Sequence, residues 1–289
     1  MFRKFLFALL LAALSGGVSV HAADNPATIT QETAVAPEPP RPLDAQDVYQ
    51  ILLGEIALQR GQVGVAALAW QDLARRTEDA RALQRAIEVS AAAQQYDAAL
   101  KLLARWTQLD GGNATEARQF KITLLLAARR ISELETPLLE MLAADPDKLA
   151  DNFLGLSRLF PQFADKDAMY TLVVRLTERY PDLAEARYTL AVAAIASEQR
   201  DIARVELERA QSLRPDWEAP LLALGDLILQ EKSADTDLAA LAAPAITRLK
   251  AFLTRHPDAR EVRLQLARVL IATQQYPLAR QEFDRLLAQ

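Results

Sequence analysis

From Asp44 to the end of the chain, small and large apolar residues return at offsets that are typical of paired α-helices. In the first copy, Gly54 is followed twelve positions later by Ala66 and, after four more, by Trp70. A related order is present in three later stretches, residues 86–106, 190–210 and 266–286. Two antiparallel helices pack closely where a small residue on one leaves room for the other. The pattern therefore predicts a series of helical hairpins.

Helix-ending signals divide this pattern at regular intervals. Gly111, Pro146, Pro181, Pro215 and Pro257 are separated by 35, 35, 34 and 42 residues. A Pro or Gly at such a place ends one helix and allows the next to begin. Three of the signals are followed by the spacing of a capping box, namely Asn113 with Glu116, Asp182 with Glu185 and Asp258 with Glu261. The spacing predicts a structural repeat of about 34 residues.

Seven repeat units are expected, at residues 47–79, 80–113, 115–148, 150–183, 184–217, 218–259 and 260–289. The third and fourth are degenerate, because Leu134 and Met169 stand where the alanine of the second helix is expected. The sixth unit carries about eight additional residues, which we place within residues 230–243. Such an insertion enlarges a turn or extends a helix.

The repeated order of residues resembles the tetratricopeptide repeat (TPR), a helix–turn–helix unit of 34 residues. The resemblance covers about 245 residues and implies an all-α, right-handed superhelical solenoid of about seven TPR-like units, residues 44–289. The chain is also similar to exported cell-envelope TPR proteins of Gram-negative bacteria, which place a proline-rich linker before the first unit. That resemblance implies no defined biochemical activity.

The N-terminal segment resembles a secretory signal peptide. Arg3 and Lys4 precede an apolar run over residues 5–14, and small residues lead to a cleavage position after Ala22. Residues 1–22 are therefore expected to be removed, an uncleaved membrane anchor being the alternative. The following residues 23–43 are rich in proline and are expected to be a disordered linker, with a ligand for a groove-binding domain as the alternative.

Composition supports a helical protein and argues against nucleic acid as a partner. Ala, Leu, Arg, Glu and Gln dominate a chain that is 51% hydrophobic, and these residues favour helices. Removal of the signal peptide takes away two positive charges and no negative one, so the formal net charge changes from −5 to −7. An acidic chain without a basic run gives no electrostatic reason to bind nucleic acid. After cleavage no membrane span is expected.

Candidate catalytic and metal-binding residues are scarce. The chain has no cysteine, and after signal cleavage its one histidine is His256, beside a helix-ending proline. Neither a catalytic triad nor a histidine metal site has the residues it needs. The glycines at 54, 61 and 64 do not form a phosphate-binding motif and are better explained by packing and by the turn. We expect no enzyme activity, no metal and no cofactor.

Partner binding is the function that the TPR resemblance implies. In that family, a concave groove is lined by the first helix of each unit and holds an extended or helical peptide. Counting from the small residues gives these groove candidates: Glu55, Gln59, Arg81, Gln84, Glu88, Tyr188, Asp226 and Arg268. The family's clamp for a C-terminal carboxylate uses Asn and Lys at such places, whereas this chain has carboxylates in its first two units. A basic or hydrogen-bonding partner segment is therefore expected.

The sequence thus predicts a non-catalytic scaffold or adaptor for a protein or peptide partner in the bacterial cell envelope. Its expected location is the periplasm, with peripheral association at the outer membrane left open. One alternative is an accessory repeat region of a larger enzyme or assembly machine that handles peptidoglycan, exopolysaccharide or outer-membrane proteins, and the chain could be part of a longer repeat protein. Another is a self-oligomerising module in which the seventh unit packs against a second copy.

Overall fold

The computed structural model describes residues 44–109, 114–159, 163–231 and 237–288. The predicted signal peptide and linker, residues 1–43, lie outside these ranges. Within them the chain forms α-helices, two short 3-10 helices and no strand. The elements are α2 (Ala45–Gln59), α3 (Val63–Thr77), α4 (Ala80–Ala92), α5 (Tyr96–Trp106), α6 (Ala114–Ala127), η1 (Ile131–Glu133), α7 (Glu135–Ala144), η2 (Pro146–Lys148), α8 (Leu149–Leu159), α9 (Lys166–Thr177), α10 (Ala184–Ala196), α11 (Arg200–Leu213), α12 (Glu218–Leu229), α13 (Leu238–Arg255), α14 (Arg260–Ala272) and α15 (Tyr276–Leu287).

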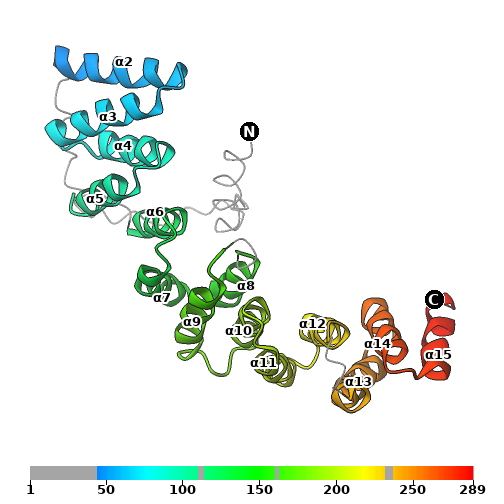
Figure 1. Ribbon diagram of the computed structural model, residues 1–289. Coiled ribbons are helices and arrows are strands. Elements are labelled where there is room, and N and C mark those ends of the chain that lie inside the picture. Colours follow the sequence, from blue (N-terminus) through cyan, green and yellow to red (C-terminus); the bar gives the residue numbers. More distant parts are fainter. Residues whose placement is uncertain (1–43, 110–113, 160–162, 232–236, 289) are drawn as a thin grey trace, which may run out of the picture. The chain divides into compact units, whose positions relative to one another are not determined.

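Successive helices pack on one another, from α2 to α6 in one stretch and from α10 to α15 in another (Figure 1). The chain divides into two compact units, Met1–Pro137 and Leu138–Gln289. In the first unit, α2 packs on α3, α3 on α4, and α4 on α5. In the second, the same succession joins α10 to α15. The structure confirms the predicted all-α solenoid of TPR-like repeats.

The turn inside the hairpins has one geometry, repeated five times. A residue with positive φ ends the first helix at Gly61 (72°), Gln94 (62°), Arg129 (58°), Glu198 (62°) and Gln274 (59°). Its N–H donates three residues back, and the next N–H donates five residues back, as in Gln95 to the Ser90 carbonyl at 2.9 Å. This is a Schellman motif, which satisfies the last carbonyls of a helix. The shared turn gives an independent register for aligning the hairpins.

Small residues lie where the sequence predicts close approach of the helices. The alanines of the second helices are buried at Ala66 (0%), Ala99 (0%), Ala203 (0%) and Ala279 (3%). Trp70 and Trp106 belong to the core of the first unit, and Trp217 is half-buried. In the degenerate third and fourth units, Leu134 (0%) and Met169 (4%) are buried at the position of that alanine. A larger core residue therefore replaces the alanine in these units.

The insertion of the sixth unit lengthens a helix. Ala245 occupies the place of Ala203 in the repeat register, yet α13 begins at Leu238, several residues earlier than that register requires. Asp237 caps the added turn by accepting from the backbone of Ala239 and Ala240 at 3.1 Å. Part of the insertion, residues 232–236, lies outside the described residues.

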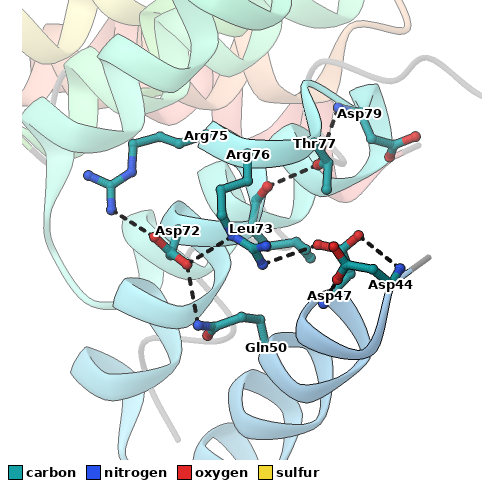
Figure 2. A network of polar contacts seen from close by, with 9 residues as sticks. All are labelled: Asp44, Asp47, Gln50, Asp72, Leu73, Arg75, Arg76, Thr77 and Asp79. Atoms are coloured by element: carbon teal, nitrogen blue, oxygen red, sulfur yellow. Dashed lines mark hydrogen bonds and ion pairs between the residues drawn. The ribbon is translucent and has the colours of Figure 1, made fainter. Parts of the chain in front are cut away.

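Two expected capping boxes are wrong. The N-caps of α10 and α14 are Leu183 and Ala259, and neither makes a side-chain cap. Each helix starts one residue later than the capping box requires. Asp182 and Asp258 therefore lie one position before the N-cap residue. Glu185 instead pairs with Arg214, Oε1 to Nη1 at 2.5 Å. A capping box is present at α2, between Asp44 and Asp47 (Figure 2).

A buried ion pair recurs in the fifth and seventh units. Arg187 pairs with Glu206 at 3.4 Å, and Arg263 pairs with Glu282 at 2.9 Å, with each side chain about nine-tenths buried. In both cases the arginine on the first helix also donates to the carbonyl of the proline six residues before it. The pair therefore ties together the two helices of a hairpin and the turn that precedes them.

Replacing Glu282 with Ala should leave the Arg263 guanidinium buried without its carboxylate. We expect this to cost about 3–5 kcal/mol of unfolding free energy, because an uncompensated buried charge is strongly unfavourable. Urea denaturation followed by circular dichroism measures the loss. Asp284→Ala, at an exposed site on the same helix, is the control and should change stability by less than about 0.5 kcal/mol. Equal midpoints for the two variants would contradict the role given to the pair.

Candidate functional site

The predicted groove residues all lie on the first helices of the hairpins. We call the surface that they form the first-helix face. They are Glu55 and Gln59 on α2; Arg81, Gln84 and Glu88 on α4; Tyr188 on α10; Asp226 on α12; and Arg268 on α14. Gln59 and Arg81 are exposed, and Tyr188 is half-buried. The others form two polar clusters, one in each compact unit.

In the first unit, Arg85 holds the two predicted carboxylates together. Its Nη2 lies 2.9 Å from Glu55 Oε1 on α2, and its Nη1 lies 3.1 Å from Glu88 Oε2 on α4. Arg85 Nε also donates to Glu55 Oε1 at 3.1 Å, so two nitrogens of the guanidinium bind the glutamate of the neighbouring helix. Burial lowers the pKa of Arg85, but the hydrogen bonds that its guanidinium donates to both carboxylates, together with their negative charges, outweigh burial and raise that pKa above its ordinary value. The cluster carries one net negative charge.

The cluster remains open to solvent and is extended along the stack. Glu55, Arg85 and Glu88 side chains are 41%, 38% and 40% exposed. Beside them, Gln84 Nε2 donates to Glu116 Oε1 on α6 at 3.1 Å. Side chains from the first helices of three consecutive hairpins thus form a polar strip that a partner segment can reach.

The second unit has an equivalent contact in which one charge is lost and another is reversed. Gln265 Nε2 on α14 donates to Asp226 Oδ1 on α12 at 2.9 Å, and Arg268 Nη1 donates to Gln265 Oε1 at 2.9 Å. Arg268 Nη1 also lies 3.4 Å from Asp226 Oδ1. In the repeat register, Asp226, Gln265 and Arg268 occupy the places of Glu55, Arg85 and Glu88. Because Gln265 replaces an arginine and Arg268 replaces a glutamate, this second cluster has one negative and one positive charge and no net charge.

Tyr188 belongs to a separate aromatic contact. Its ring lies 4.9 Å from the ring of Trp217, and the guanidinium of Arg214 lies 5.4 Å from the centre of that tryptophan ring. Burial raises the pKa of Tyr188 above its ordinary value, so the phenol stays neutral. The structure does not bring Tyr188 into either polar cluster.

Sequence reasoning missed Arg85 and Gln265, the residues that connect each cluster. A signal for both was present, because each lies three positions before a predicted residue on the same helix, at the spacing of neighbours on one helical face. Their partners on the preceding first helix are 30 and 39 residues away, so only the repeat register brings them together.

The glycine at the base of the first cluster has a packing role. Gly54 is buried, and a Cβ added there would lie 2.5 Å from Nε1 of Trp70. On its other side, the Trp70 ring lies 5.9 Å from the Arg85 guanidinium. Gly54 therefore lets the tryptophan approach α2 and support the arginine.

The rest of the described structure offers little chemistry. Among the residues that it covers, no three His, Cys, Asp or Glu side chains gather closely enough to hold a metal ion. His256 Nε2 lies 2.9 Å from Asp216 Oδ1, and this hydrogen bond lowers the pKa of Asp216 below its ordinary value. Within the same ranges, no helix has the length and apolar character that a membrane crossing requires.

Comparison with known proteins finds similarity of fold. Neither a family model nor a curated protein matches the sequence. A crystal structure of MamA protein is 16% identical over 60% of this chain and 90% of that chain, with a TM-score of 0.42. YrrB, described as a TPR protein with an unusual peptide-binding site, is 17% identical over 61% and 91%, with a TM-score of 0.33. A tetratricopeptide repeat protein from Parabacteroides merdae is 12% identical over 85% and 93%, with a TM-score of 0.36.

Replacing Gly54 with Ala tests the close approach of α2 and Trp70. The added methyl group has no room, so we expect a loss of about 1–3 kcal/mol of unfolding free energy. Gly155→Ala is the matched control, because nothing lies within 4 Å of a Cβ at this helical position. At Gly155, the higher helix propensity of Ala should increase the unfolding free energy by at most about 1 kcal/mol. Thermal denaturation compares the two, and a stabilising effect at both sites would refute the packing role of Gly54.

Proposed function

We propose that this chain is an exported, non-catalytic interaction scaffold of the bacterial cell envelope, which binds a segment of a partner protein along the first-helix face. The observation that carries the proposal is the polar strip of Glu55, Arg85 and Glu88 with the Gln84–Glu116 contact. Glu55, Arg85 and Glu88 are held by each other across two hairpins and remain about 40% exposed. The half-buried Gln84–Glu116 contact extends the strip to the third hairpin. Binding to such a preformed surface costs little side-chain entropy.

The charge of the strip defines the partner. The excess carboxylate of the first unit favours a segment that brings Lys, Arg or backbone N–H groups to Glu55 and Glu88. The equivalent cluster of the second unit, with Asp226 and Arg268, offers both an acceptor and a donor. Basic residues of a partner suit the first cluster, and mixed polar residues suit the second, each cluster being a contact site of its own unit.

Partner capture tests this function in the cell envelope. A photo-crosslinking residue in place of Arg81, which is exposed on α4, should capture a partner, whereas one in place of Lys101, exposed on the second helix α5, should not. Glu55→Gln with Glu88→Gln should then weaken binding of that partner about tenfold and reduce its dependence on salt, because two charged contacts are lost. Equal capture at both positions would refute the proposed face.

The control for the double variant is Glu178→Gln with Asp284→Asn, which removes the same charge from exposed positions outside the first helices. If both double variants reduce affinity equally, the effect is one of net charge and the specific role of Glu55 and Glu88 fails. The alternative of an accessory repeat region would be supported if the chain were recovered from the cell envelope as part of a larger enzyme or assembly machine.

Export is tested separately from partner binding. Cells that express the whole chain should release it on osmotic shock, with Ala23 as its N-terminal residue by mass spectrometry, because Arg3 and Lys4 precede a short apolar run. A chain that begins at Met1 and resists a carbonate wash of the membranes would instead be anchored by residues 5–14.

A further inference from the structure

Four large apolar side chains flank the Asp226–Arg268 contact on the first-helix face of the second compact unit. On each of α12 and α14, one lies four residues before the charged residue and one lies three residues after it. Residues at these spacings share one face of a helix. We call them the apolar frame, and its members are Leu222, Leu229, Leu264 and Ile271.

The frame is open to solvent, most of all on α14. Leu264 and Ile271 are 38% and 43% exposed, and the two frame residues of α12 are half-buried. Between them, the side chains of Asp226 and Arg268 are 52% and 51% exposed. A partner can therefore reach apolar and charged groups in one place.

Gln265 and Gly225 fix the two helices that carry the frame. Gln265 is buried, and its Nε2 donates to the Leu222 carbonyl oxygen at 3.2 Å as well as to Asp226. A Cβ at Gly225 would lie 2.5 Å from Cγ of Gln265, so the glycine allows α12 and α14 to pack closely (Figure 1). Binding to a surface fixed in this way needs little rearrangement.

The first compact unit does not repeat the frame. In the repeat register, α4 has Gln84 and Ala91 at the frame positions, so no two successive first helices of that unit carry large apolar residues at both. In the second unit, α10 continues the frame with Tyr188 and Ile195, which pack against the same core. The two units thus present different surfaces, one polar and acidic, the other largely apolar around one ion pair.

The spacing of the frame matches a helix. Frame residues on one helix are seven positions apart, which corresponds to about 10.5 Å along its axis. Packed helices lie about 8–10 Å apart, so the frame has nearly the same spacing in both directions. A partner helix repeats its side chains at this interval when they are seven positions apart. Side chains on one face of a strand recur about every 7 Å and would not meet the frame residues in step.

A polyproline II segment fits the frame less well. Every third residue recurs at about 9.3 Å, which is a suitable spacing, but the backbone N–H and C=O groups have no partners within such a segment. The apolar side chains of the frame offer them none, whereas a helix satisfies its own backbone groups. The chain's own linker, residues 23–43 with five prolines, is therefore not the occupant that the frame favours.

We infer that the second compact unit binds an amphipathic helix of a partner, with two apolar side chains seven positions apart on the apolar frame and an uncharged polar side chain between them. This inference rests on the proposed function, because the helix would be part of the partner segment on the first-helix face. The Asp226–Arg268 pair has no net charge, so an Asn or Gln amide suits it best. Such an amide donates to the carboxylate and accepts from the guanidinium.

Selection from a library of random peptides of about 20 residues, long enough to form a helix, tests the inference on the whole chain as the cell processes it. We expect the enriched peptides to carry large apolar residues seven positions apart with a polar residue between them. Proline on the opposite side of such a peptide should reduce its affinity at least about tenfold, because it breaks the helix. Alanine at the same place should not.

Variants of the chain locate the bound peptide. Leu264→Ser with Ile271→Ser should weaken binding about tenfold with unchanged circular dichroism, because apolar contacts are lost. Ile202→Ser with Val205→Ser is the matched control, because these residues are 38% and 54% exposed on the second helix α11. The control should leave the affinity unchanged. The peptide substitutions test the helix independently of how these variants fold.

Several results would overturn the inference. They are enriched peptides that are rich in proline or alternate apolar with polar residues, peptides that bind the Leu264 and Ile271 variant unchanged, and the absence of any enriched peptide. A dimer of the chain that this variant dissociates would make a second copy the occupant and would also overturn it. Peptides that are lost with Glu55→Gln and Glu88→Gln but keep their affinity for the frame variant would support the proposed polar strip alone, and the reverse result would support the frame alone.

Discussion

Close approach of helices at small residues is the constraint on which the structure depends. Gly54 admits the ring of Trp70, and Ala66, Ala99 and Ala203 are buried where two helices meet. Because the helices lie close, large side chains reach the neighbouring hairpin and form a continuous core in each compact unit. The same geometry brings equivalent positions of successive first helices within hydrogen-bonding distance. The polar clusters of the candidate site are a result of this spacing.

The repeat could be predicted from sequence because its determinants are local. A small residue, a turn and a second small residue lie within about 20 positions, and the order is copied along the chain. Four of the five Schellman turns contain Gln, Glu or Arg at positive φ where glycine is the usual signal, so their geometry had to be seen. The expected capping boxes at Asp182 and Asp258 failed because one residue of difference in a helix start moves the aspartate out of the cap position.

The candidate site was predicted in part. Glu55 and Glu88 are visible as polar residues at equivalent positions, but the sequence does not show that Arg85 joins them. That contact depends on the separation of α2 and α4, which their packing sets. The exposure of one side of α2 was missed as well. Val48, Leu52 and Ile56 look like ordinary core residues in a helix, yet they are 43%, 55% and 44% exposed.

The buried pairs Arg187–Glu206 and Arg263–Glu282 also restrict how this chain can change during evolution. Losing either member first leaves a charge in the core, so the first of two substitutions is opposed even where an apolar pair would be equally stable. Each arginine additionally holds the carbonyl of the preceding proline. In divergent descendants, the fifth and seventh hairpins should therefore be recognisable by residues that change together, after the rest of the repeat pattern has faded.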